Sequence, residues 1–281
     1  MHNKGFVIFA QENSKVDYLR QAYALSLSIK NHMLDSKTCL ITNIHVPKNM
    51  SHVFDYVLDI PGEDLAQNSD WKIHNRCKIY DITPFEQSII LDADMLVCSD
   101  IGHWWNFLSN FNLFFTNHVM TYRNELVDDQ YYRKTFIKNQ LPNLYCGMHY
   151  YRKCNANYPF VNLLKQIIEN YERTYDKILT FDSQSWCSMD ISVSIAAKML
   201  DLTHKITSRV PYITFTHMKP YIQNWQYPTD HWMKKVNVYF DTQCSIKIDN
   251  FLQQGILHYV ESEFLSQELL QNLERKYHEL H

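Results

Sequence analysis

The sequence predicts an α/β protein in which a mostly parallel sheet is flanked by helices. Three observations support this fold class: short continuous apolar runs, amphipathic segments between them, and a composition of 46% hydrophobic and 20% charged residues over 281 positions. Continuous apolar runs are typical of strands that are buried on both faces, as in parallel sheets. A chain of this length and composition can bury a large core.

The first hundred residues alternate between the two kinds of segment. Gly5–Ala10 (GFVIFA) is a continuous apolar run, and Tyr18–His32 carries apolar residues at helical spacing. Thr38–Ile44 and Val53–Asp59 are expected strands, and Gln87–Val97 contains the strongest buried strand of the chain. Strands that alternate with helices imply parallel strands joined by crossover helices.

The second half of the chain is less regular. Apolar runs predict further strands at Asn112–His118, Tyr145–Tyr151, Tyr212–Thr216 and Gly255–Val260. Helical spacing predicts helices at Phe160–Tyr175, Ser188–Leu200 and Glu263–His281. No repeat or linker interrupts the sequence, so we expect one domain over residues 1–281, with residues 263–281 as a terminal helix.

Composition and charge exclude several classes of protein. The five glycines are scattered. Dinucleotide fingerprints and P-loops need clustered glycines that let backbone N–H groups approach phosphates, so both are excluded. A sugar nucleotidyltransferase, which needs a glycine-rich loop near its start, is disfavoured for the same reason. The net charge is −3, without a basic field, which argues against a nucleic acid as the main partner.

Cysteine usage and hydropathy bear on the expected compartment. The seven cysteines are scattered and form no CxxC pair, so a zinc ribbon or a disulfide framework is not expected. No stretch approaches the roughly 18 apolar residues of a membrane span, and the apolar run at the N-terminus is too short for a signal-peptide core. We therefore expect a cytoplasmic protein without a membrane span.

The segment Ser88–Val97 (SIILDADMLV) carries the residues with the clearest chemical meaning. An apolar strand delivers Asp92 and Asp94 at its carboxyl end, where open α/β sheets bind ligands. Residues i and i+2 of an extended strand point the same way, so the two carboxylates are expected to converge. Two like charges this close favour a divalent cation with oxygen ligands between them. The alternative is a polar loop with both carboxylates in solvent.

Two enzyme classes place a DxD motif after a buried strand. The first consists of the DxD glycosyltransferases of the GT-A fold, and the second of the haloacid-dehalogenase-like phosphatases, in which Asp92 would be the nucleophile. The phosphatase motif normally stands near the start of its domain, whereas about 90 residues precede Asp92 here. This position favours a glycosyltransferase. A non-catalytic sugar-nucleotide-binding module also remains open.

Residues 5–260 resemble the glycogenin-like family 8 glycosyltransferases, most specifically at 76–97 and at His258. The strand Phe6–Ala10, the loop after it and the following helix are similar to the part of that family that holds the nucleotide base. This resemblance implies that Ala10 and Gln11 line a uridine site and that Tyr18 stacks on the base. A basic residue sixteen positions before the DxD motif contacts the donor in that family, and Arg76 stands there.

Downstream, the resemblance is carried by fewer residues. Gly147 alone remains of an Asn-Ser-Gly pattern, and Asp190 matches the first residue of an Asp-Gln pair, with Ile191 in place of Gln. His258, in the strand GILHYV, stands where the family has its third metal ligand. The Lys-Pro-Trp sequence that follows this histidine in the family is absent. His217 and Lys219 form a second cluster that stands earlier in the chain.

The resemblance implies a metal-dependent glycosyltransferase that moves a sugar from a UDP-sugar to an unidentified acceptor with retention of configuration. Mn²⁺ or Mg²⁺ would be held by Asp92, Asp94 and His258, and the nucleotide sugar would contact Arg76 and Ala93 as well. Arg76, Asp190 and Asp129, with Asp128 beside it, are the expected catalytic residues. Residues 1–100 would form the nucleotide-binding half, and residues 101–262 the less regular sugar and acceptor half.

Overall fold

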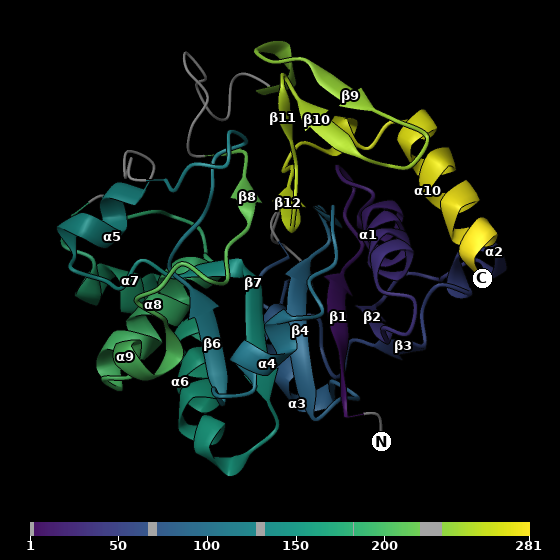
Figure 1. Ribbon diagram of the computed structural model, residues 1–281. Coiled ribbons are helices and arrows are strands. Elements are labelled where there is room, and N and C mark those ends of the chain that lie inside the picture. The colour runs from purple at the N-terminus through teal and green to yellow at the C-terminus, as the bar shows by residue number, and fades with distance from the viewer. Residues whose placement is uncertain (1–2, 67–71, 128–132, 182, 220–231) are drawn as a thin grey trace.

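The computed structural model describes residues 3–66, 72–127, 133–181, 183–219 and 232–281 (Figure 1). Among these residues, a six-stranded sheet has the order β3-β2-β1-β4-β7-β6. Its strands are β1 (Lys4–Ala10), β2 (Thr38–Thr42), β3 (Tyr56–Asp59), β4 (Gln87–Asp92), β6 (Leu113–Thr116) and β7 (Tyr145–Arg152). The strands β1 to β4 are parallel, whereas β7 is antiparallel to both β4 and β6. The expected α/β fold with a mostly parallel sheet is confirmed.

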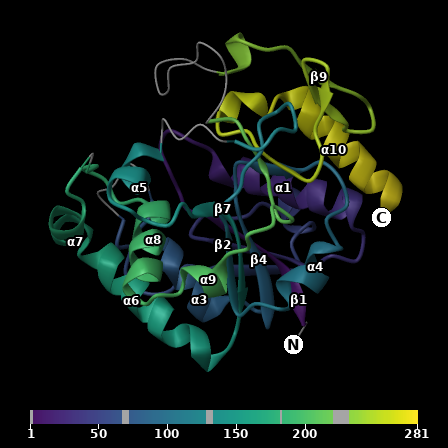
Figure 2. The same ribbon diagram turned by 60° about the vertical axis from the view of Figure 1, so that its left-hand side comes forward.

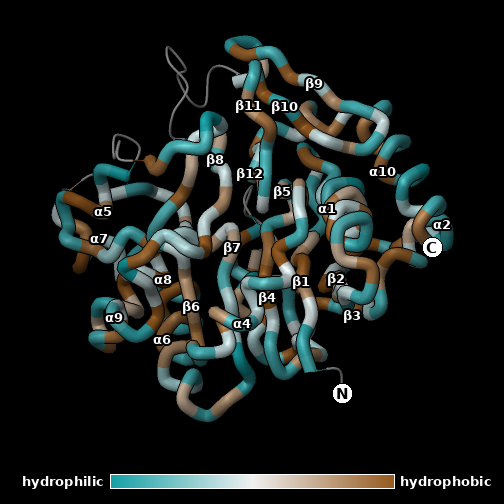
Figure 3. Tube along the Cα trace, in the orientation of Figure 1, coloured by the Kyte–Doolittle hydropathy of each residue, from teal (hydrophilic) through white to brown (hydrophobic). Residues whose placement is uncertain are grey.

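Helices cover both faces of this sheet (Figures 1 and 2). The helices are α1 (Tyr18–His32), α2 (Lys48–Ser51), α3 (Ile79–Ile82), α4 (Trp104–Leu108), α5 (Lys134–Lys138), α6 (Tyr158–Glu169), α7 (Tyr171–Ile178), α8 (Met189–Met199), α9 (Thr203–Ile206) and α10 (Gln267–Leu280). Because side chains alternate along β1, Phe6 and Ile8 belong to the core shared with α1 and α10, whereas Val7 and Phe9 pack in the core shared with α6 and α8. Figure 3 shows hydrophobic stretches along the central strands.

Helix α1 fixes the position of the segment that follows β4. The helix begins where the Asp17 side chain accepts a hydrogen bond from the Arg20 N–H, a common N-cap arrangement. In the middle of the helix, Ser28 Oγ donates to the Leu25 carbonyl at 2.7 Å and accepts from the Val97 N–H at 3.0 Å. This buried hydroxyl ties α1 to the strand that leads away from the DxD motif.

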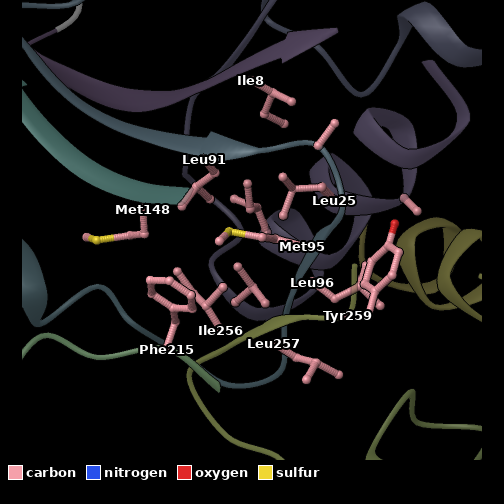
Figure 4. Packing of buried hydrophobic residues seen from close by; sticks show 14 of the residues in the cluster. Ile8, Leu25, Leu91, Met95, Leu96, Met148, Phe215, Ile256, Leu257 and Tyr259 are labelled. Carbon is pink, nitrogen blue, oxygen red and sulfur yellow. The ribbon is translucent and has the colours of Figure 1, made fainter. Parts of the chain in front are cut away.

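The predicted strand Gln87–Val97 is two strands separated by a turn at Ala93 and Asp94. β4 ends at Asp92, and β5 (Met95–Val97) leaves the large sheet and pairs antiparallel with β12 (Ile256–His258). β12 in turn pairs parallel with β8 (Thr216–His217), so these three strands form a second sheet. Apolar residues resume directly after the turn because the side chains of β5 are buried as well. They pack with those of β12 under α1 (Figure 4).

Other predicted elements differ in their bounds. The predicted helix Phe160–Tyr175 is interrupted at Asn170, whose φ of −120° and ψ of 34° end α6 and begin α7. Of the predicted strand Tyr212–Thr216, only Thr216 is in a strand, and α10 begins at Gln267 after a 3₁₀ turn. The short strands β9 (Val238–Phe240), β10 (Ile246–Ile248) and β11 (Phe251–Leu252) form a third sheet that the sequence pattern does not predict.

Within the described ranges, each helix is too short or too polar to cross a bilayer.

Substitution of Gly5 tests how tightly the start of β1 is packed. A Cβ atom at Gly5 would lie 2.3 to 2.6 Å from three ring atoms of Phe85, a fully buried residue whose ring contacts Tyr56 edge-on. We expect Gly5→Ala to lower the free energy of unfolding by about 1–3 kcal/mol, because the buried ring cannot move aside without strain. Urea unfolding measures this change. The same alanine should cost less in a Phe85→Leu background, and an equal cost in both backgrounds would contradict the packing explanation.

Candidate active site

Three side chains from two sheets meet beyond the carboxyl end of β4. Asp92 is the last residue of β4, Asp94 lies in the following turn, and His258 ends β12 opposite Met95 of β5. Each offers one ligand atom, and these atoms lie within 4.8 Å of one another. His258 Nε2 lies 3.0 Å from Asp94 Oδ2, and Arg76 forms an ion pair with Asp92. The carboxylates converge because the chain turns between them, and not because they share an extended strand.

Burial and opposing charges determine how the two carboxylates titrate. Burial raises the pKa of Asp92, and the nearby charge of Asp94 adds to this effect although the Arg76 guanidinium opposes it. Burial alone would also raise the pKa of Asp94, but the His258 imidazole and the Lys219 ammonium lower it below its ordinary value. One carboxylate of the pair is therefore harder to ionise than the other, as expected for two like charges in a confined space.

The glycine of β7 leaves space beside these groups. A Cβ atom on Gly147 would lie 3.4 Å from Asp92 Oδ2, 3.4 Å from His258 Nδ1 and 2.8 Å from Met95 Cε. His258 Nδ1 is buried and has no hydrogen-bond partner among the described residues. Two carboxylate oxygens and an imidazole nitrogen are a donor set that suits a manganese-like divalent cation. The residues present therefore fit such an ion, both in chemistry and in available space.

His217, which the sequence groups with Lys219 in a second cluster, lies beside His258. Its ring stacks on that of His258, with the ring centroids 4.7 Å apart and the planes 11° from parallel. Burial lowers its pKa well below the ordinary value, and the His258 ring adds to that shift, so His217 is neutral at pH 7. His217 is not one of the three side chains whose ligand atoms converge. Its contact with His258 makes it a packing partner of the candidate ligand.

Asp190 is held in place by two groups that lie far from it in the sequence, the Cys146 N–H and the Arg133 guanidinium. It lies in the first turn of α8, where its Oδ1 accepts a hydrogen bond from the Cys146 N–H at 2.9 Å and its Oδ2 pairs with Arg133. The Arg133 guanidinium lies between two rings, 3.6 Å from the centroid of Phe136 and 4.2 Å from that of Tyr145. Burial alone would raise the pKa of Asp190, but Arg133 and the Cys146 N–H lower it. Asp190 is therefore fixed in place and ionised at pH 7.

The Cys146 thiol links this ion pair to the first one. Burial raises the pKa of the thiol, and it is affected by the charges of Asp190, Arg76 and Asp92. The ion pairs Arg133–Asp190 and Arg76–Asp92 therefore belong to one cluster of charges around β7. The sequence does not indicate that Arg133 pairs with Asp190, because 57 positions separate the two residues and no motif connects them.

The expected uridine-site residues lie at the end of β1 and at the start of α1. Ala10 ends β1, and Tyr18, which is partly buried, begins α1. The Gln11 side chain is 2% exposed; its Nε2 donates to Asp64 Oδ1 at 2.9 Å, and its Oε1 accepts from Asn75 Nδ2 at 3.0 Å. The amide of Gln11 thus holds the segment that contains Asp64 and Asn75, two residues that the sequence does not point to.

Of the other residues that the sequence analysis names, some lie in the described structure and some do not. Ala93 is buried in the turn between the two carboxylates, where its side chain is 4% exposed. Asp128 and Asp129 lie outside the described residues. Ile191, which stands in place of the family glutamine, is 2% exposed and packs in the core that α6 and α8 share, so it adds no polar group to the cluster.

Solved structures of glycosyltransferases share this fold. An active-site mutant of LgtC is 13% identical with a TM-score of 0.53, and the match covers 98% of this chain and 94% of LgtC. The galactosyltransferase LgtC in complex with donor and acceptor sugar analogs is 12% identical with a TM-score of 0.51, at the same coverage. The bifunctional glycosyltransferase WbbM is 11% identical with a TM-score of 0.51, over 98% of this chain and 50% of WbbM.

The chain spans about half the length of two of the matched proteins. It covers 50% of WbbM and 46% of the glycosyltransferase GlyE of Streptococcus pneumoniae, whose TM-score is 0.42 at 14% identity over 74% of this chain. No family model matches the sequence, and no curated protein matches it either. At these identities the likeness shows the fold alone: the chain has the GT-A-type α/β fold that these glycosyltransferases share.

The contribution of the Arg133–Asp190 pair can be measured with a double-mutant cycle. We expect Arg133→Met to lower the free energy of unfolding by about 3 kcal/mol at pH 7, because it leaves a largely buried carboxylate, 27% exposed, without its partner. In an Asp190→Asn background the same change should cost much less. An equal cost in both backgrounds would show that the pair contributes nothing to stability.

The pH dependence of this pair has a defined sign. Because the folded-state pKa of Asp190 is lowered, its contribution to stability is complete above the unfolded-state pKa of about 3.9. The contribution is lost as the pH falls through the lower folded-state value. The stability difference between the wild-type protein and Arg133→Met should therefore shrink between pH 7 and pH 3, as measured by urea unfolding at each pH.

Proposed function

We propose that this protein is a metal-dependent glycosyltransferase that moves a sugar from a UDP-sugar to an acceptor. The observation that carries the proposal is the convergence of Asp92, Asp94 and His258 within 4.8 Å at the carboxyl end of a central strand of a GT-A-type sheet. Ligands in open α/β sheets bind at this edge. The similarity in fold to LgtC, which is described with donor and acceptor sugar analogs, supports the same reading.

Asp92, Asp94 and His258 are the proposed ligands of a Mn²⁺ or Mg²⁺ ion. When bound, such an ion supplies positive charge that neutralises a departing nucleoside diphosphate. Arg76 holds Asp92 in place and adds a fixed positive charge at the same point. Gly147 keeps a side chain out of the space between Asp92 and His258. In the proposal, the end of β4 is therefore a preorganised cation site with the positive charge of Arg76 beside it.

The donor nucleotide would lie along the end of β1. Phe9 of β1 is in register with Asp92 of β4, so the two residues after Phe9, Ala10 and Gln11, come out at the same edge of the sheet as the proposed ion site. Gln11 holds Asp64 and Asn75 in place by hydrogen bonds. In the proposal, these residues form one side of the uridine site. In the proposal, Tyr18 supplies the ring that stacks on the base.

Asp190 is the proposed partner of the transferred sugar. Its side chain is 27% exposed, whereas that of Arg133, which holds it, is 4% exposed. The carboxylate can therefore accept hydrogen bonds from sugar hydroxyl groups while Arg133 fixes its direction. Asp129, which lies outside the described residues, remains a proposed second carboxylate for the sugar hydroxyl groups. The proposal includes retention of configuration, which rests on the resemblance.

A phosphatase and a binding module are the two competing functions. A phosphatase would need the Asp92 carboxylate as a nucleophile, but Arg76 holds that carboxylate in an ion pair. A binding module needs no group that acts on the transferred sugar, yet Asp190 is fixed and ionised within the same cluster of charges. Both observations favour the transferase.

The proposal predicts that UDP and Mn²⁺ stabilise the protein jointly. At a hundredfold excess over the dissociation constant, the pair should raise the free energy of unfolding by about 2.7 kcal/mol, and either one alone should do much less. Thermal unfolding with UDP, with other nucleoside diphosphates and with each metal measures this. Equal shifts with every nucleotide, or no shift with any, would contradict the uridine assignment.

Variants separate the three functions in the same assay. His258→Ala should remove the joint effect of UDP and Mn²⁺, because one proposed ligand is lost, whereas His217→Ala should retain it. Asp92→Asn should abolish nucleotide-sugar turnover. If the wild-type protein instead hydrolyses a phosphate ester with Mg²⁺ and traps labelled phosphate on Asp92, the protein is a phosphatase. Joint binding without any turnover of nucleotide sugars would favour the binding module.

A further inference from the structure

An open cleft of about 520 Å³ lies away from the candidate active site. Arg123 and Glu125, in the loop after β6, line one side of it. The other side is lined by Tyr239 of β9, by Asn237 just before that strand and by Asn250 in the turn between β10 and β11. In Figure 1 this sheet stands above β12 and β8. None of these five residues has a role in the proposed transfer site.

The two sides of the cleft are joined by specific contacts. The Tyr122 hydroxyl donates to Asp249 Oδ2 at 3.3 Å, and Gln253 Nε2 donates to the Tyr122 carbonyl at 2.8 Å. The rings of Tyr122 and Phe251 meet edge to face, with their centroids 6.0 Å apart. Gln253 is 1% exposed and Tyr122 is 5% exposed, so these contacts are protected from water. The cleft is therefore formed before any ligand binds, which lowers the entropic cost of binding.

Each side of the cleft is connected to a strand that carries one of the two stacked histidines. On one side, the Met120 carbonyl accepts from the His217 N–H at 2.9 Å, just before the loop that contains Arg123. On the other side, β11 leads through a short connection into β12 and His258. Seven residue steps separate Phe251 from His258, so the two lie at most about 25 Å apart. That distance is within reach of a chain of a few sugar units.

The side chains of the cleft suit a carbohydrate. Tyr239, in β9, is 57% exposed, so its ring is available for stacking. Asn237 stands just before β9, where its Nδ2 donates to Asp249 Oδ1 at 3.4 Å. Arg123 is oriented because its Nε donates to the Tyr122 hydroxyl at 3.2 Å. A pyranose ring presents an apolar C–H face and a rim of hydroxyl groups, which match an exposed aromatic ring beside guanidinium and amide groups. Glu125 disfavours phosphorylated ligands by charge.

We propose that this cleft binds the distal sugar units of an oligosaccharide acceptor. Tyr239 stacks on a pyranose ring, while Arg123 and Asn237 hydrogen-bond to its hydroxyl groups. The acceptor role rests on the proposed function, whereas sugar binding by the cleft does not. The substrate class that follows for the transferase is a glycan several units long, held both at the transfer site and at this cleft.

Saturation-transfer NMR with the full chain tests this proposal. The probes are maltotetraose, cellotetraose, chitotetraose and lacto-N-neotetraose, each titrated without nucleotide or metal. We expect at least one of them to bind with a dissociation constant in the millimolar range, and Tyr239→Ala and Arg123→Ala each to weaken it about tenfold. Tyr239→Phe, which keeps the ring, should bind as the wild-type protein does. Tyr158→Ala, at a tyrosine of α6 that is 69% exposed, is the matched control and should have no effect.

The outcomes distinguish this inference from the proposed function. Thermal unfolding shows that each variant is folded, and UDP with Mn²⁺ is titrated into the same samples. If none of the four tetrasaccharides binds, or if Tyr239→Ala binds them as well as the wild-type protein, the inference is wrong even when UDP binds. If the cleft binds sugar but UDP and Mn²⁺ do not bind, the proposed function fails and the carbohydrate site stands.

Discussion

Two carboxylates confined to one turn are the constraint on which the rest of the site depends. Asp92 and Asp94 lie at the end of a buried strand, where repulsion between like charges is only weakly screened. Arg76 pairs with the first carboxylate, and the His258 imidazole lies 3.0 Å from the second, so each carboxylate has its own polar partner. The partners come from segments distant in sequence, and the fold must therefore bring β4, β12 and the turn before α3 to one point.

The departure of the chain from the large sheet makes this arrangement possible. Had β4 continued straight, Asp94 would have stayed within the large sheet, without contact to β12. Instead the turn releases β5 to pair with β12, and that pairing sets His258 opposite Met95. Ser28 of α1 holds the end of β5 by a buried hydrogen bond, and Gly147 of β7 leaves room on the other side. The position of the His258 imidazole therefore depends on α1, on the turn after β4 and on Gly147.

Local patterns in the sequence predict the elements that depend on local contacts. The bounds of α1 follow from its apolar spacing, and β1 and β7 follow from their apolar runs. The turn at Ala93 and Asp94 was not predictable, because the residues on both sides are equally apolar and are buried in different sheets. The same reasoning applies to the strands β9 to β11, since two or three residues are too few to show an alternating pattern.

The candidate site shows the same division between local and distant information. The DxD motif and Arg76 are sixteen residues apart, and the resemblance to a known pattern connected them. Arg133 had no such pattern, and neither had Asp64 and Asn75, which hydrogen-bond to Gln11 and to each other.

The central claim is that Asp92, Asp94 and His258 hold a divalent cation. An anomalous difference map of crystals grown with UDP and Mn²⁺ tests this claim most directly. The account predicts one manganese peak at bonding distance from Asp92, Asp94 and His258, whereas a peak elsewhere, or none between these side chains, would contradict it.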